Sequence, residues 1–152
     1  MEGILSMKCI TLTVDGIVPY IGGIVLVRRK NEPFKGHYAL PGGIVEYGET
    51  VEEAVIREVH EETGLECEVK RLVGVYSDPE RDPRGHFVSV CFLMDVRGGE
   101  LRAGSDADDV KVFKLGELPP LAFDHSRMLK DAEVMLSGIL SKVQEHNDLS
   151  GR

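Results

Sequence analysis

The sequence predicts an α/β fold in which a mixed β-sheet lies between helices. Strand-like segments occur at both hairpin and crossover spacings, and two substantial helical patterns are available to cover the faces of a sheet. The chain has 152 residues, 42% of them hydrophobic, so residues 1–152 are expected to form a single domain with its own core.

Five apolar or alternating segments predict the strands. Residues 8–14 alternate and are rich in β-branched side chains, and Asp15-Gly16 is expected to turn the chain after them. Residues 20–29 are apolar on both faces, which is typical of a central strand. An acidic loop is expected at residues 104–109, and the remaining strands are expected at residues 66–76, 86–96 and 110–115.

Capping residues predict where the helices begin and end. Thr50 and Glu53 form a capping box, nothing interrupts residues 51–63, and Gly64 supplies the left-handed conformation that ends a helix. Asp124 is expected to cap a last amphipathic helix that reaches about His146. The tail, residues 147–152, is expected to be frayed.

Composition and charge exclude several classes of protein. Lys and Arg number 18 against 26 Asp and Glu, and the net charge of −8 argues against binding to nucleic acid or to an anionic membrane. The sequence has no apolar run long enough to predict a membrane span, and no secretory signal is evident. Met7 is an alternative start to Met1. Cys9, Cys67 and Cys91 lie in strand-like segments and predict buried thiols in a reducing cytoplasm.

The acidic excess is concentrated in one segment. Residues 43–65 contain seven Glu and one Arg, a net charge of −6, which leaves −2 for the other 129 residues. At 100° per residue, Glu58, Glu61 and Glu62 fall within an arc of about 100° on the predicted helix. Apolar residues of the first half of the helix lie on the same side, so one face changes from apolar to acidic along its length.

Carboxylates that share a face toward the protein repel one another and favour a bound counter-charge. Oxygen ligands without a cluster of His or Cys favour Mg²⁺, Mn²⁺ or Ca²⁺ over Zn²⁺, and Mg²⁺ also binds phosphates, so a phosphate compound is the expected substrate. Backbone carbonyls of the turn Pro41-Gly42-Gly43 are a further source of ligands, and Arg57 is placed to pair with Glu49. A solvated acidic helix face is the alternative interpretation of the same charges.

The spacing of these residues resembles the Nudix box. Gly43, Glu49 and the run from Arg57 to Leu65 match every fixed position of G-x5-E-x7-R-E-U-x-E-E-x-G-U, where U is aliphatic. The resemblance implies an α/β/α sandwich and a loop–helix–loop that holds one to three Mg²⁺ or Mn²⁺ ions. It also implies hydrolysis of a nucleoside diphosphate linked to another moiety X.

The same resemblance implies roles for individual residues. Glu58 and Glu62 are the core metal ligands, and the Gly42 carbonyl is an inner-sphere partner. Glu61 is a further metal ligand or the catalytic base, and Asp106 in the acidic loop competes with it as the base. The positions that brace the box are Gly43, Glu49, Arg57 and Gly64.

Segments outside the box resemble short archaeal and bacterial members of the ADP-ribose pyrophosphatase type. These segments are residues 36–43, 74–86 and 121–125, and they extend the resemblance across most of residues 20–130. Pro79 lies 14 residues beyond the box, where a proline marks ADP-ribose preference in that branch; a turn-forming proline is the alternative. ADP-ribose is therefore the expected substrate.

Other substrates and another class of function stay open at this level. Oxidised (d)NTPs and dinucleoside polyphosphates are alternative substrates, and a non-catalytic nucleotide-sensing module is an alternative function. We expect a small-molecule nucleotide substrate, a cytoplasmic location and, by resemblance, a homodimer. Guanidinium groups match phosphate oxygens and aromatic rings stack on bases, so the expected substrate-binding residues are Arg28, Tyr38, Pro79, Arg81 and Arg84.

Overall fold

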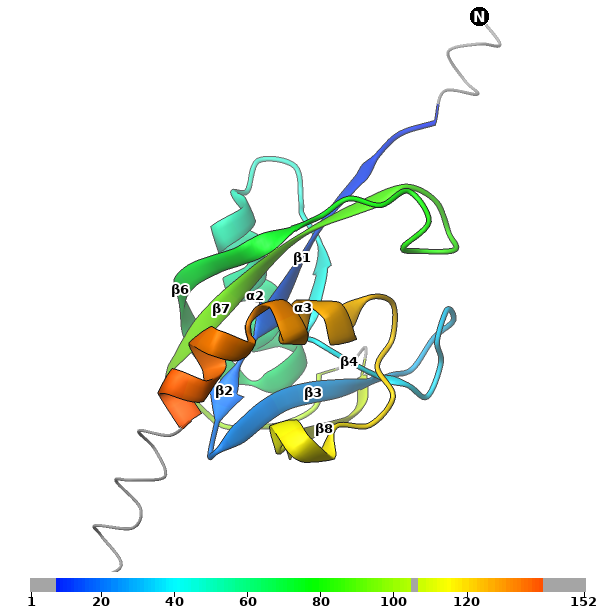
Figure 1. Cartoon of the computed structure of the whole chain (residues 1–152). Coiled ribbons are helices and arrows are strands. Elements are labelled where there is room, and N and C mark those ends of the chain that lie inside the picture. Colours follow the sequence, from blue (N-terminus) through cyan, green and yellow to red (C-terminus); the bar gives the residue numbers. More distant parts are fainter. Residues whose placement is uncertain (1–7, 105–106, 141–152) are drawn as a thin grey trace, which may run out of the picture.

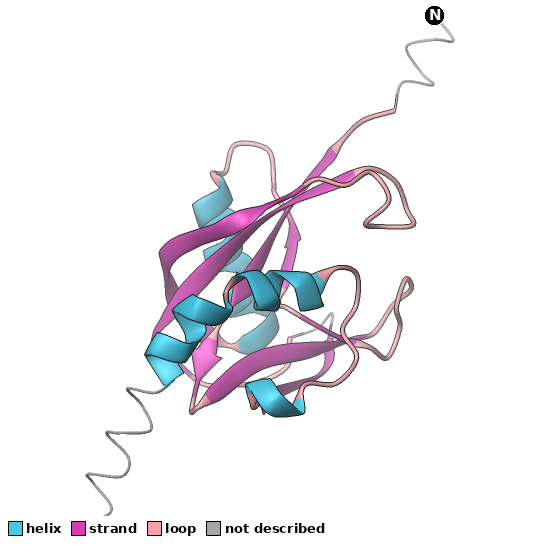
Figure 2. Ribbon diagram, in the orientation of Figure 1, coloured by secondary structure: helices cyan, strands magenta, loops and turns pink. Residues whose placement is uncertain are grey.

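The structure is a computed structural model that describes residues 8–104 and 107–140. Its strands form two sheets, and helices α2 and α3 lie on opposite sides of them (Figures 1 and 2). The predicted α/β architecture, with a mixed sheet between helices, is confirmed. None of the helices within the described ranges has the length and apolar character needed to span a membrane.

The first sheet is mixed. Strands β1 and β7 pair in parallel, whereas β5 pairs with β1 and β6 pairs with β7 in antiparallel fashion. The parallel pair is central, so β1 is hydrogen-bonded along both of its edges. The order of the strands is β5 (Gly42–Ile44), β1 (Thr11–Ile17), β7 (Phe87–Gly99) and β6 (Leu65–Tyr76).

The second sheet is antiparallel and is built around strand β3. Strands β2, β4 and β8 all pair with β3 in antiparallel register. A 3₁₀-helix at Leu115–Glu117 follows β8. The strands are β2 (Pro19–Tyr20), β3 (Gly23–Arg29), β4 (Tyr38–Ala39) and β8 (Ala107–Phe113).

Alternation along strand β7 divides the hydrophobic core between the two helices. Cys91 and Leu93 pack in the cluster that contains residues of α3 (His125–Asp131). Phe92 and Met94 pack in the cluster that contains residues of α2 (Val51–Thr63). Successive strand residues point to opposite faces, so one buried strand supports both layers of the sandwich.

The predicted limits of helix α2 are confirmed. Thr50 is its N-cap, and the Thr50 hydroxyl oxygen accepts a hydrogen bond from the Glu53 N–H at 3.1 Å. Gly64 has φ 78°, and its N–H donates to the His60 carbonyl at 2.9 Å. A side chain at Gly64 would be strained by this φ and would place a Cβ 2.1 Å from the Glu100 carbonyl oxygen.

Two local predictions at the start of the chain are wrong. Asp15 and Gly16 do not form a turn but lie inside strand β1, because pairing with strands on both sides outweighs the local turn preference. Residues 20–29 are not one strand. Ile21 and Gly22 adopt φ values of 48° and 78° and turn the chain between β2 and β3.

Later parts of the chain also differ from the predictions. Strand β8 begins at Ala107, inside the expected loop 104–109, because its backbone pairs with β3. Asp124 occupies the N-cap position of α3, but its carboxylate makes no cap hydrogen bond and accepts instead from Arg81.

The last helix is interrupted. Helix α3 ends at Asp131, and residues 133–140 are again helical. His146 and the tail 147–152 lie outside the described residues.

The cysteines bear out the burial prediction in two cases of three. Cys67 and Cys91 are buried within strands β6 and β7, whereas Cys9 is exposed. Cys9 precedes the first residue of β1, so it lies outside the paired part of the sheet that would bury it.

The N-cap of α2 gives a test of the local energetics. Replacing Thr50→Ala removes the acceptor for the Glu53 N–H and should lower the free energy of unfolding by about 1 kcal/mol. Urea denaturation followed by circular dichroism measures the change. Thr50→Ser keeps the hydroxyl and is the matched control; an equal loss in both variants would contradict a capping role.

Candidate active site

Helix α2 carries three carboxylates, Glu58, Glu61 and Glu62, in its C-terminal half. Ala54, Val55 and Val59 are fully buried and fix the rotation of the helix against the strands. The Glu58 side chain is only 15% exposed, whereas that of Glu61 is 56% exposed. Glu58 therefore lies against the protein, and Glu61 lies at the solvent edge of the same face.

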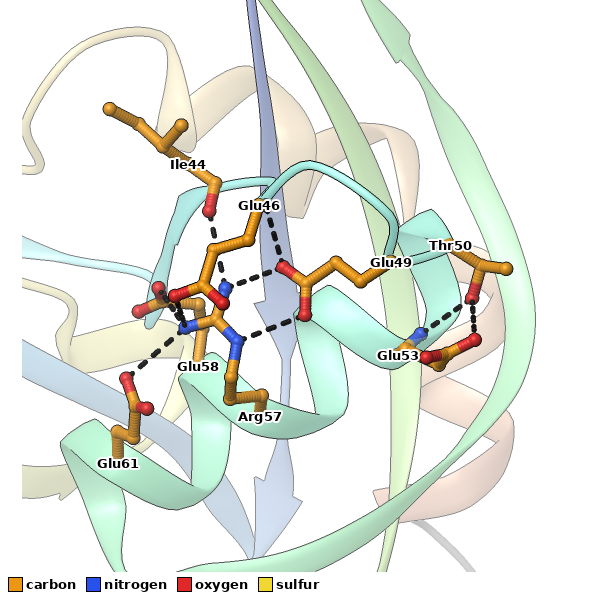
Figure 3. A network of polar contacts seen from close by, with 8 residues as sticks. All are labelled: Ile44, Glu46, Glu49, Thr50, Glu53, Arg57, Glu58 and Glu61. Carbon is orange, nitrogen blue, oxygen red and sulfur yellow. Dashed lines mark hydrogen bonds and ion pairs between the residues drawn. The ribbon is translucent and has the colours of Figure 1, made fainter.

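Arg57 is the centre of a network of charges, which Figure 3 shows from close by. Its guanidinium donates to both carboxylate oxygens of Glu49, at 3.0 and 2.6 Å, and to the Ile44 carbonyl at 3.2 Å. One terminal nitrogen also contacts Glu58 at 2.8 Å and Glu61 at 3.3 Å. The expected contact between Arg57 and Glu49 is present, and it ties the loop before α2 to the helix.

Hydrogen bonds between Arg57 and the carboxylates shift the pKa values of both partners. Hydrogen bonds from the Arg57 side chain and the Glu46 N–H lower the pKa of Glu49 to about 2. The hydrogen bond to Glu49 raises the pKa of Arg57, and contacts with Glu58 add to this. Glu49 is therefore ionised throughout the neutral and mildly acidic range.

Two glycines bring the backbone of strand β5 against the carboxylates of α2. A Cβ on Gly43 would lie 2.5 Å from the carboxyl carbon of Glu58, so a side chain here would displace the Glu58 carboxylate from its present position. The Gly42 N–H donates to the Glu62 carboxylate at 3.1 Å. The turn and the helix thus meet at the two glutamates that the sequence predicts as metal ligands.

The donors at this junction fit a hard divalent cation. They are carboxylate and carbonyl oxygens, which Mg²⁺ and Mn²⁺ prefer. Within the described ranges, however, no three His, Cys, Asp or Glu side chains are already grouped as a metal site. Arg57 engages Glu58 and Glu61, and the Gly42 N–H engages Glu62, so cation binding would exchange these contacts for metal bonds.

A cavity of about 260 Å³ opens beside this junction. Gly42, Gly43 and Glu62 form part of its wall. The wall also includes a set of basic side chains, namely Arg28, Arg29, Lys30, Arg81 and Arg84. Acidic and basic groups therefore face one space, which suits a phosphate ligand that would bind together with a divalent cation.

Arg84 and Arg29 converge on the ring of Phe123. The guanidinium carbon lies 4.9 Å from the ring centroid for Arg29 and 5.7 Å for Arg84. Arg84 also bonds the buried Asp82 carboxylate at 3.1 and 2.7 Å and lies over Phe87. Burial and the nearby charge of Arg84 lower the pKa of Arg29, as expected where two cations are held together.

Arg81 differs from Arg84 in exposure. Its side chain is 5% exposed and donates two hydrogen bonds to Asp124, at 2.9 and 2.6 Å, whereas the Arg84 side chain is 45% exposed. Arg84 is thus the more accessible of the two for a ligand, and Arg81 mainly joins its loop to the start of α3.

Two predicted substrate-binding residues lie outside the lining of the cavity. Tyr38 donates a hydrogen bond from its hydroxyl to Asp109 at 3.0 Å, and its ring packs edge-on against Phe113 at 4.9 Å. Pro79 is exposed in the loop between β6 and β7. Asp106 lies outside the described residues, so its predicted role as a base stays a prediction.

Comparison with known proteins identifies the family. The NUDIX domain matches residues 11–132. The chain belongs to the NUDIX family. It is 60% identical over 120 residues to an ADP-ribose pyrophosphatase of Methanocaldococcus jannaschii, an alignment that covers 79% of this chain and 71% of that protein. The predicted resemblance to this branch is therefore confirmed.

Solved NUDIX structures share the fold. The bifunctional NMN adenylyltransferase/ADP ribose pyrophosphatase of Francisella tularensis, complexed with AMP and a Mn ion, aligns with a TM-score of 0.76 and 30% identity. That alignment covers 86% of this chain and 43% of the other. The NUDIX domain of Shewanella oneidensis NrtR, complexed with ADP ribose, aligns with a TM-score of 0.73 and 27% identity, covering 89% and 97% of the two chains.

The cavity is also lined by residues that the sequence patterns did not assign to the site. Asp15, Asp82 and His125 line the cavity and are buried. Burial raises the pKa of Asp15 and lowers that of His125, so it favours the neutral form of each. A carboxylate in the middle of an apolar strand would indicate Asp15 as a functional residue. This indication is available only when residues 15 and 16 are predicted as strand and not as a turn.

The acid branch of the stability profile should depend on Glu49. The pKa of Glu49 is about 2 in the folded protein, against an ordinary value of 4.5. Ionised Glu49 therefore stabilises the fold fully when the pH is above 4.5, and this contribution is lost as the pH falls toward about 2. Glu49→Gln removes the contribution. The difference in unfolding free energy between wild type and variant, measured in EDTA by urea denaturation, should shrink between pH 4.5 and 2. A difference that does not change with pH would contradict the assignment.

Proposed function

We propose that this NUDIX protein hydrolyses the diphosphate of ADP-ribose to AMP and ribose 5-phosphate, with Mg²⁺ or Mn²⁺ as cofactor. The observation that carries the proposal is the 60% identity to an ADP-ribose pyrophosphatase. The geometry supports it, because Glu62 of the box and a set of arginines face the same cavity.

Residues of the box would hold the cation. Glu58, Glu62 and the Gly42 carbonyl are the proposed ligands, with Glu61 as a further ligand, for one to three ions. A bound divalent cation would lower the pKa of a water molecule and neutralise charge on the phosphate oxygens.

Four further positions of the box are proposed to brace it, namely Gly43, Glu49, Arg57 and Gly64. Gly43 leaves room for the Glu58 carboxylate, and Gly64 ends α2 at the box.

Arginines of the cavity would bind the substrate diphosphate. Arg84 and Arg29 are mutually repulsive cations beside one ring, and a diphosphate between them would relieve this repulsion. Arg28 and Arg81 also line the cavity and are placed to add contacts. Pro79 and Tyr38 stay predictions as substrate-binding residues, because the structure places neither in the cavity wall.

The reaction is a displacement at phosphorus. The water oxygen forms a bond to one phosphorus while the bond from that phosphorus to the bridging oxygen breaks. The bridging oxygen leaves with the other phosphate, and a base takes the proton from the water. Glu61 and Asp106 are the two candidates for this base, and Glu61 is the one whose exposed carboxylate the structure describes.

Removal of a proposed metal ligand gives the first test of this assignment. Glu58→Gln or Glu62→Gln should lower kcat for ADP-ribose by about 10²–10⁴ while the circular dichroism spectrum is unchanged. Glu52→Gln is the matched control, because Glu52 is an exposed carboxylate on the same helix outside the acidic face. Wild-type turnover in both Glu58 and Glu62 variants would refute the proposed metal site.

Arg84 gives a second test, which addresses the substrate. Arg84→Gln removes a charge-assisted hydrogen bond to the diphosphate and should raise KM for ADP-ribose about tenfold or more. Arg97→Gln is the control, since Arg97 is exposed and pairs with Glu68 and Asp95 on strands β6 and β7. An unchanged KM in the Arg84 variant would remove this residue from the substrate site.

A product assay decides the substrate class. Pure protein with Mg²⁺ is incubated with ADP-ribose, 8-oxo-dGTP and diadenosine polyphosphates, and the products are separated by chromatography. AMP and ribose 5-phosphate formed fastest from ADP-ribose are the expected result. Faster turnover of another substrate would replace ADP-ribose in the proposal, and binding of ADP-ribose without turnover of any substrate would indicate a sensing module.

Location and assembly complete the proposal. We propose a cytoplasmic protein, which the buried thiols of Cys67 and Cys91 support, and a homodimer, which the family resemblance supports. Analytical ultracentrifugation measures the second of these directly.

A further inference from the structure

A chain of buried polar groups connects the start of helix α3 to the backbone that precedes Gly42. His125 is 3% exposed and Asp15 is 8% exposed. The Leu40 N–H donates to His125 Nδ1 at 3.0 Å, and His125 Nε2 lies 3.4 Å from Asp15 Oδ1. The Ser89 hydroxyl donates to the other oxygen of Asp15. These groups come from β1, β7, α3 and the residue after β4.

The hydrogen bonds determine the tautomer of His125. Nδ1 accepts a hydrogen bond from a backbone N–H, so it carries no proton, and the ring proton of the neutral imidazole resides on Nε2. Nε2 faces Asp15 Oδ1 at 3.4 Å. The imidazole therefore has one acceptor directed at Leu40 and one donor directed at Asp15, and the two ring atoms can be tested separately.

The acceptor acts on a short stretch of backbone that leads to the proposed cation site. Each residue from Leu40 to Gly42 makes a hydrogen bond to a group outside this stretch, and Gly42 also pairs with Asp15 where β5 joins β1. The Leu40 N–H bonds His125, the Pro41 carbonyl accepts from the Gly16 N–H at 2.8 Å, and the Gly42 N–H bonds Glu62 at 3.1 Å. The contact at Gly42 involves a proposed metal ligand and would change on cation binding. The contacts at Leu40 and Pro41, together with the pairing of β5 with β1, would then hold the backbone that carries the Gly42 carbonyl.

The segment that carries His125 is itself held beside strand β4. Leu121 forms a parallel bridge with Tyr38, and the Ala122 N–H donates to the Tyr38 carbonyl at 2.9 Å. Figure 1 shows this segment running past β4 into α3. Asp124, the next residue before His125, binds Arg81 of the cavity wall. The start of α3 thus contacts both the basic wall and the backbone on the acidic side.

We propose that His125 is a positioning residue for the divalent cation: through Nδ1 it holds the Leu40–Gly42 backbone so that the Gly42 carbonyl is directed at the ion. This inference rests on the proposed cation site at Glu58, Glu62 and Gly42. A purely structural role, in which the imidazole only fills the core, would make no distinction between its two nitrogens.

Two substitutions separate the nitrogens. In His125→Asn the side-chain oxygen takes the place of Nδ1 and can accept from the Leu40 N–H. In His125→Gln the amide reaches the place of Nε2 and leaves Leu40 without its acceptor. Both variants remove the ring, so both should lose some thermal stability, but only the Gln variant should disturb Gly42.

The readout is Mn²⁺ affinity of the full chain without substrate, measured by electron paramagnetic resonance of the free ion. His125→Gln should weaken Mn²⁺ binding about tenfold or more, in line with the effect of losing a group that orients a metal ligand. His125→Asn should stay within about threefold of wild type. His60→Gln, an exposed histidine on α2, is the matched control and should bind as wild type does.

The outcomes separate this inference from the proposed function. Equal Mn²⁺ affinities in the Asn and Gln variants would overturn the positioning role, whatever the activity. Different affinities in a protein that does not hydrolyse ADP-ribose would support the positioning role and refute the substrate assignment. Absence of Mn²⁺ binding in the wild type would overturn both the cation site and the role of His125.

A measurement on the wild-type protein covers the case in which the Gln variant does not fold. Nitrogen-15 NMR of the imidazole reports which ring nitrogen is protonated. The Nε2–H tautomer with a slowly exchanging Leu40 amide is the expected result. The Nδ1–H tautomer would overturn the inference, because Nδ1 would then be unable to accept from Leu40.

Discussion

The attraction between Arg57 and the carboxylates around it is the interaction on which the proposed site depends. Glutamates on one face of a helix repel one another, and a single guanidinium beside them offsets this repulsion while it also bonds Glu49. Because Glu49 belongs to the loop before α2, the same group that balances the charge fixes the loop to the helix. Gly42 and Gly43 then lie against the glutamates, and the Gly42 N–H bonds Glu62.

The two-sided core places this acidic junction opposite a basic wall. Strand β7 packs one set of side chains toward α2 and the alternate set toward α3, so both helices are fixed to the same strand. Helix α2 contributes Glu62 to the cavity wall, and the start of α3 contributes Asp124, which holds Arg81, and His125. Arg81 and Leu40 bind these two residues, so the cavity lies where the two layers of the sandwich meet. A substrate that carries a diphosphate matches both walls.

Patterns of residues close in sequence predict part of this arrangement. The part that they do not predict depends on contacts between residues far apart in the chain. Helix α2, its caps and the contact between Arg57 and Glu49 involve residues close in sequence, and all were predictable. Asp15 and His125 are 110 positions apart in the chain, and their contact exists because β1 and α3 pack together. Asp15 was also misread as part of a turn, because Asp-Gly favours turns wherever no neighbouring strand competes. Tyr38 matched an aromatic position for substrate, but its hydroxyl is engaged by Asp109 of another strand.

The sequence by itself determined the family, the helix of the box and the residue types at the proposed metal ligands. Those features depend on spacing along one helix and its flanking loops, where covalent geometry dictates which side chains are neighbours. Only the tertiary structure decided which arginines reach the cavity, that Glu61 lies at the solvent edge, and that Asp15, Ser89 and His125 form one buried chain. These depend on the register of paired strands and on which helix covers which face, and no local pattern encodes either.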